Sequence, residues 1–108
     1  QIRFSMGMER LSDQVEKEGR DLTILEAVID NGPIGIVRLS EETGIPEHKV
    51  RYSLRMLEDD ELVDPTPQGA IPADDIDQRV ADINEGIETL VDRLEDLEEL
   101  FTTTEAAE

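Results

Sequence analysis

The sequence of 108 residues contains no cysteine and a single histidine, His48. Without cysteine there can be neither disulfide bonds nor thiolate metal ligands, and one histidine is too few for a zinc centre of familiar spacing. These absences exclude thiol chemistry and metal-dependent hydrolysis, and we expect neither a metal nor another cofactor.

Long apolar runs are also missing, so no segment is expected to span a bilayer, and no basic segment followed by an apolar stretch suggests a secretory signal. We therefore expect a soluble cytoplasmic protein with no membrane partner. Leucine, isoleucine, valine and phenylalanine nevertheless make up 30 of the 108 residues, which is well above the composition of disordered chains. The length allows one compact domain, or one small domain with an extended appendage.

Basic residues are scarce: 28 acids outnumber 10 bases, for a formal charge of −18. An acidic balance normally argues against a nucleic-acid partner, because lysine and arginine drive phosphate binding. Here, however, the acids are spread over almost every polar face, which resembles the proteins of salt-loving archaea. At about 1 M salt the Debye length is roughly 3 Å, so distant charges scarcely repel DNA. Net charge alone therefore does not exclude DNA.

The first part of the chain has the apolar spacing of helices over residues 8–17 and again from Asp21. Gly19 lies between these runs, so two helices or one kinked helix fit equally well. The second run is expected to end at Gly32, which can adopt a left-handed cap, because Pro33 cannot continue a helix.

The middle of the chain predicts two short helices followed by a hairpin. The first helix covers Ile36–Thr43 and is closed by Gly44, and the second covers Pro46–Asp59 with proline suited to its first turn. Two extended pieces follow at 62–63 and 70–71, joined by six residues that carry the turn chemistry of a hairpin.

The second short helix is predicted to be amphipathic. Val50, Leu54 and Leu57 fall on one side, which we expect to face the core. The opposite side is basic and aromatic, with His48, Tyr52 and Arg55 on it and Lys49 and Met56 next to them. A helix, a glycine-containing turn and a second helix of this pattern form the DNA-reading helix-turn-helix unit.

Residues 39–46, LSEETGIP, and residues 50–58, VRYSLRMLE, followed by Leu62 and Val63, carry a resemblance to a known family. They resemble winged helix-turn-helix transcriptional regulators of the broad MarR, ArsR and Lrp-like type, and most of all small haloarchaeal ones. The resemblance covers about residues 21–71 and implies that 46–59 is the recognition helix, that 65–70 forms the wing, and that the partner is double-stranded DNA.

The resemblance also implies which side chains meet DNA in the major groove, from Pro46 to Arg55. Base edges would be read by His48, Lys49 and Tyr52, and phosphates or flanking bases would be met by Arg38, Arg51 and Arg55. Wings that enter the minor groove usually carry arginine or lysine, whereas this wing has neither between Asp64 and Ile71, so whether it touches DNA stays open.

The charge distribution supports this interpretation independently. Residues 33–57 contain four bases and three acids, a net charge of +1, which leaves −19 for the rest of the chain. A near-neutral island with its bases on the recognition helix is typical of a DNA-facing surface against an acidic background. The alternative is that Arg51 and Arg55 form ion pairs with Glu47, Glu58 or Asp59 on the same helix. We favour DNA contact.

After Pro72, apolar residues recur at alternating spacings of four and three. The seam consists of Ile76, Val80, Ile83, Ile87, Leu90, Leu94, Leu97 and Phe101. Four heptads predict a coiled coil. Folding back over a winged core of about 50 residues would leave part of the seam uncovered, so we expect a homodimer, with the strand direction open.

The expected fold is mainly α, a winged helix-turn-helix with a short β-hairpin wing and a long C-terminal coiled-coil helix. The domains would be an N-terminal helical extension (1–19), the winged helix-turn-helix (20–73), the dimerisation helix (74–101) and a disordered tail (102–108).

Two acidic clusters, at 58–61 and 74–77, lack the glycine and terminal glutamate of a calcium loop and have no nucleophile beside them, so we expect no enzyme activity. The sequence predicts a sequence-specific DNA-binding transcriptional regulator that acts as a homodimer. The alternative is a winged-helix module that binds another protein of the transcription machinery and does not read DNA.

Overall fold

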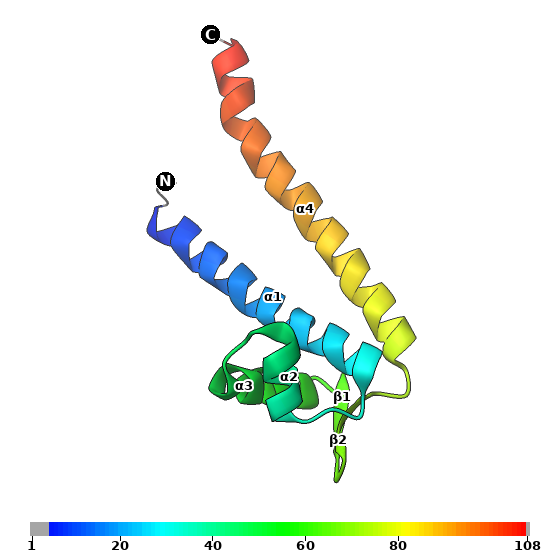
Figure 1. Cartoon of the computed structure of the whole chain (residues 1–108). Helices are drawn as coiled ribbons and strands as arrows, with labels where there is room; N and C mark the ends of the chain where they lie inside the picture. Colours follow the sequence, from blue (N-terminus) through cyan, green and yellow to red (C-terminus); the bar gives the residue numbers. More distant parts are fainter. Residues whose placement is uncertain (1–4, 108) are drawn as a thin grey trace. The chain divides into compact units, whose positions relative to one another are not determined.

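The computed structural model describes residues 5–107, and the side chains of residues 5–101. The chain divides between Asp74 and Asp75 into two compact units. The first unit contains α1 (Met6–Asn31), α2 (Ile36–Thr43), α3 (Glu47–Asp59), β1 (Val63–Thr66) and β2 (Gly69–Pro72), and the second contains α4 (Ile76–Ala107) (Figure 1). The mainly α fold is confirmed: it is a winged helix-turn-helix followed by a long C-terminal helix.

Helix α1 is a single helix that runs through Gly19 without a break. The Ser5 hydroxyl caps its first turn by accepting a hydrogen bond from the Met8 amide at 3.3 Å. Only the second half of α1 is buried, through Ile24, Leu25 and Val28, and this half packs against α2 and α3, while the first half extends beyond them (Figure 1).

The end of α1 is where we expected it, but the left-handed cap expected at Gly32 is wrong. Gly32 is extended, with φ −63° and ψ 147°, and the peptide bond to Pro33 is cis. Glycine is required here by close approach, because a Cβ atom would lie 2.6 Å from the carbonyl oxygen of Val28. The chain then passes to Ile34, which exchanges two backbone hydrogen bonds with Ala70 of β2.

Helices α2 and α3 form the helix-turn-helix at the expected residues. Gly44 closes α2 in the left-handed conformation, with φ 74°, and the Ser40 hydroxyl donates to the carbonyl of Ile45 at 2.7 Å. Pro46 is the N-cap of α3 and does not occupy its first turn, so the helix begins one residue later than predicted.

The hairpin is longer and its turn is tighter than the sequence predicts. β1 and β2 pair from Val63 with Pro72 to Thr66 with Gly69, which leaves only two residues in the turn. Pro65 fits in an edge strand because its partner Ala70 directs its own backbone groups to Ile34, so no amide hydrogen is needed from the proline.

Helix α4 begins at Ile76 and has 32 residues, a length of about 48 Å. It continues to Ala107, beyond the seam that ends at Phe101. Of the tail expected at 102–108, the side chains and Glu108 lie outside the described residues. No helix in the described part of the chain is long and apolar enough to cross a membrane.

Gly69→Ala tests the contact between the wing and Ile34. Gly69 has φ 127°, and a Cβ atom would lie 2.5 Å from the Ile34 carbonyl carbon, so we expect a loss of about 2 kcal/mol or more in the free energy of unfolding. Chemical denaturation followed by circular dichroism measures it. Gly19→Ala is the matched control, since its site is open and helical, and it should stabilise the protein by up to about 1 kcal/mol. Equal stability of both variants would contradict this account of the wing.

Candidate nucleic-acid interface

Helix α3 is amphipathic, and its buried side fixes which residues face outward. Val50, Ser53, Leu54 and Leu57 are buried and lie within about 100° of one another around the helix. The helix packs against α1, α2 and β1 through this side. The opposite side of α3 is therefore held at the surface by the core beneath it.

The predicted DNA-contact residues are all exposed in the structure. Six of them lie on α3 or at its N-cap, and Arg38 lies on α2. On α3 a central stripe of exposed side chains is flanked by one basic residue on each side. The stripe consists of His48, Tyr52 and Arg55, and the flanking bases are Arg51 and Lys49. We call the exposed residues Pro46, His48, Lys49, Arg51, Tyr52 and Arg55 the α3 face.

The bases of the α3 face are not engaged by neighbouring acids. Within residues 5–101, no ion pair of 4.0 Å or less joins a carboxylate to Lys49, Arg51 or Arg55. The alternative ion pairs of Arg51 and Arg55 within α3 are therefore not seen. Their charges are available to a partner with negative charge.

Arg38 differs from the other bases because it already has a partner. Its guanidinium lies 2.9 Å from a carboxylate oxygen of Glu42, one turn along α2, and both side chains are exposed. An exposed pair of this kind contributes at most about 1 kcal/mol. Such a pair can be exchanged for a phosphate contact at small cost.

Tyr52 has a neighbour that the sequence analysis missed. The Arg20 guanidinium carbon, on α1, lies 5.5 Å from the centroid of the Tyr52 ring, a distance typical of a cation–π contact. Arg20 Nε also donates a hydrogen bond of 3.0 Å to the hydroxyl of the fully buried Ser53. The signal was present, because Arg20 precedes Ile24 and Val28 at intervals of four and so lies on the buried side of α1.

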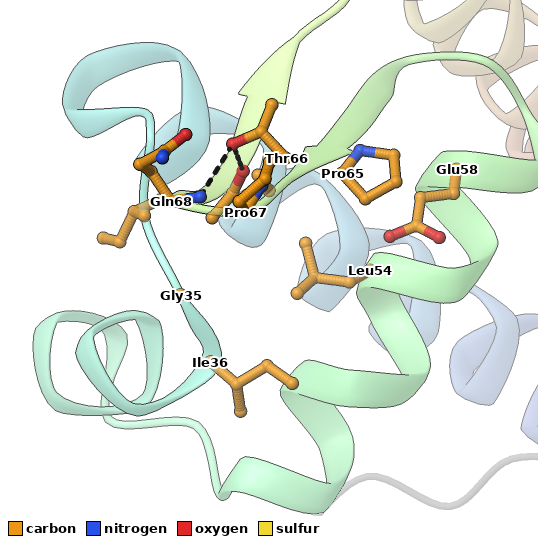
Figure 2. Close-up of a pocket in the computed structure, with 11 residues that line it drawn as sticks. Gly35, Ile36, Leu54, Glu58, Pro65, Thr66, Pro67 and Gln68 are labelled. Carbon is orange, nitrogen blue, oxygen red and sulfur yellow. Dashed lines mark hydrogen bonds between the residues drawn. The ribbon is translucent and has the colours of Figure 1, made fainter.

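The wing offers little to a phosphate backbone. A groove of about 330 Å³ lies beside the wing. It is lined by the wing, by residues 34–36, and by Leu54 and Glu58 of α3 (Figure 2). Thr66 locks the turn by donating to the Gly69 carbonyl at 2.6 Å and accepting from the Gln68 amide at 3.2 Å. Among the residues that line the groove, the single charged side chain is that of Glu58. The groove is therefore not an anion site.

The acidic clusters form no metal site in the part of the chain that the structure describes. No group of three or more histidine, cysteine, aspartate or glutamate residues there is placed to hold a metal ion. Apart from the half-buried Glu58, these acids are exposed, near the end of α3 and the start of α4.

The predicted dimer seam lies along one side of α4. Its first three residues are half-buried, and the others are exposed, up to 78 % for Phe101. The half-buried residues are Ile76, Val80 and Ile83, and the exposed ones are Ile87, Leu90, Leu94, Leu97 and Phe101. Val91 and Leu100 widen this exposed apolar surface.

Comparison with known families agrees with the geometry. Residues 17–64 match the family model described as winged helix-turn-helix DNA-binding. A comparison with curated proteins gives no match. The matched segment runs from the second half of α1 to the start of β1 and contains Arg38 and the whole α3 face. Over these residues the chain is similar to winged helix-turn-helix DNA-binding domains, and this similarity supports a DNA-binding regulator.

Proposed function

We propose that this chain is a sequence-specific transcriptional regulator that binds double-stranded DNA as a homodimer, in the manner of MarR, ArsR and Lrp-like proteins. The observation that carries the proposal is the α3 face, on the helix that this fold uses for reading DNA. There an exposed tyrosine lies among three basic residues that have no carboxylate within 4.0 Å among the described residues. Insertion of α3 into a major groove places Tyr52 and His48 at base edges.

Electrostatics limits the conditions under which this binding works. The α3 face is surrounded by a chain that carries −18 overall, so at low salt the distant acids repel DNA. At about 1 M salt the repulsion between distant acids and DNA is screened, whereas attractions between charges a few ångströms apart survive. The proposal therefore includes a cytoplasm of high salt, as in halophilic archaea.

The exposed seam of α4 supports the homodimer. A solvated apolar stripe of this length is unfavourable, and pairing with the same stripe of a second copy removes it from water at about 25 cal/mol per Å². The seam has the heptad spacing of a coiled coil, in which the apolar positions of two helices pack against each other. A dimer presents two α3 helices and so matches a pseudo-palindromic site.

Features of the wing favour a second candidate function. The uncharged turn at Pro67 and Gln68, the acid Asp64 in β1 and the groove in Figure 2 suit a protein partner better than a phosphate backbone. In that case the chain would be a winged-helix module that binds a protein of the transcription machinery without reading bases.

Selection of bound genomic fragments at about 1 M KCl separates the two candidates, because distant repulsion is screened there. We expect the chain to enrich one sequence motif. If it enriches none, the proposal of a sequence-specific regulator is wrong and the second candidate gains support.

Alanine variants of the α3 face test how the enriched sequence is bound. Arg51→Ala and Arg55→Ala should each weaken binding to all sequences, because each removes a phosphate contact, and each should reduce the salt slope by about one. Tyr52→Ala should instead change the preferred sequence. Fluorescence anisotropy on enriched and unrelated duplexes measures both effects.

Arg10→Ala serves as the matched control, since it removes the same charge from the exposed first half of α1. It should bind as the wild type does. Unaltered binding by all three α3 variants would contradict the assignment of the α3 face.

Leu90→Asp tests the seam. A carboxylate in the middle of the apolar interface would be buried without a partner, so the variant should be a monomer where the wild type is a dimer. Light scattering measures the mass in solution. Thr89→Asp adds the same charge one residue away from the seam and should remain dimeric; a dimeric Leu90→Asp would show that α4 does not form the interface.

A further inference from the structure

We propose that Arg20 is a positioning residue for Tyr52, and that it makes Tyr52 read DNA with its hydroxyl edge. This inference rests on the proposed function, because it assigns a role in DNA reading to a residue of α1. It goes beyond the α3 face, since Arg20 lies outside the near-neutral island of residues 33–57.

Arg20 covers one face of the Tyr52 ring. The guanidinium carbon lies 5.5 Å from the ring centroid, while 51 % of the tyrosine remains exposed. A ring covered on one face cannot be sandwiched between two bases. Its hydroxyl, which can both donate and accept a hydrogen bond, remains for a base edge.

The protein also holds the Arg20 guanidinium in place. An arginine side chain is flexible, so a single contact with a ring would order neither group. Here Arg20 Nε donates to the Ser53 hydroxyl at 3.0 Å, and Ser53 is fully buried next to Tyr52 in α3. The hydrogen bond therefore ties the guanidinium to the same helix that carries the tyrosine.

Arg20 is placed to position Tyr52 and not to bind a phosphate. Arg20 Nε lies 4.0 Å from Oδ1 of Asp21, and their side chains are only 20 % and 15 % exposed. That Asp21 oxygen is buried and accepts no hydrogen bond within the described residues. Arg20 is thus half-buried beside a carboxylate, in contrast to Arg51 and Arg55, which are exposed and have no carboxylate within 4.0 Å among the described residues.

The free protein gives the first test, because Tyr52 is the only tyrosine and the chain contains no tryptophan. Tyrosine emission therefore reports one ring. Arg20→Gln should increase the quenching of this emission by acrylamide, since it uncovers a ring face, and Ser53→Ala should do the same while preserving the arginine. Arg10→Gln, with the same charge change in the exposed half of α1, should leave quenching unchanged. Circular dichroism confirms that each variant is folded. Equal quenching in all four proteins would overturn the proposal.

DNA binding gives the second test. Arg20→Gln should reduce the preference for the selected sequence over an unrelated duplex by about two- to fivefold, the range that an exposed cation–π contact supplies. In the Tyr52→Ala background the same substitution should have no effect on this preference, because the two residues act as one unit. An equal loss in both backgrounds would overturn the positioning role.

The two tests fail separately from the proposed function. If the wild type shows no sequence preference, the proposed function is wrong, and the DNA-reading role of Arg20 is wrong with it. A quenching difference between Arg20→Gln and Arg10→Gln would still establish that Arg20 covers the ring.

Discussion

Burial of one side of α3 against α1 and α2 is the constraint on which the surface of this protein depends. Ile24 of α1, Leu39 of α2 and Val50 of α3 are fully buried, and the three helices pack against one another in every pairing. Each such side chain contributes about 1.5–3 kcal/mol when it leaves water. This core fixes the rotation of α3 about its own axis. The residues left outside are then a basic and aromatic set, because the 3.6-residue period separates them from the buried ones.

The distribution of charge indicates which kind of partner the outer side of α3 suits. Acids dominate the chain as a whole, yet Lys49, Arg51 and Arg55 have no carboxylate within ion-pair distance among the described residues. In so acidic a chain, basic side chains without carboxylate partners are suited to bind the phosphates of DNA. Arg20 shows a different arrangement, since it is half-buried, donates a hydrogen bond to the Ser53 hydroxyl and lies 4.0 Å from a carboxylate oxygen of Asp21. The structure thus contains basic residues that are available to a partner, and one, Arg20, whose guanidinium contacts other residues of the protein.

Much of this fold follows from local signals. Gly44 and the apolar periods predict α2 and α3 to within a residue, because capping and amphipathicity are properties of a single segment. Contacts between segments could not be predicted in the same way. A Cβ atom at Gly32 would lie 3.1 Å from the carbonyl oxygen of Ala70 in β2, and Pro65 fits in a strand only because Ala70 pairs with Ile34. Likewise, periodicity can place Arg20 on the buried side of α1, whereas its contact with a tyrosine 32 residues later requires the packed structure.

The proposed function depends on contact between the α3 face and DNA. The most direct measurement is the change in backbone amide chemical shifts when a selected DNA duplex is added to the protein at high salt. We expect the largest changes on residues 46–55. Changes concentrated on the wing or on α4, with residues 46–55 unmoved, would contradict it.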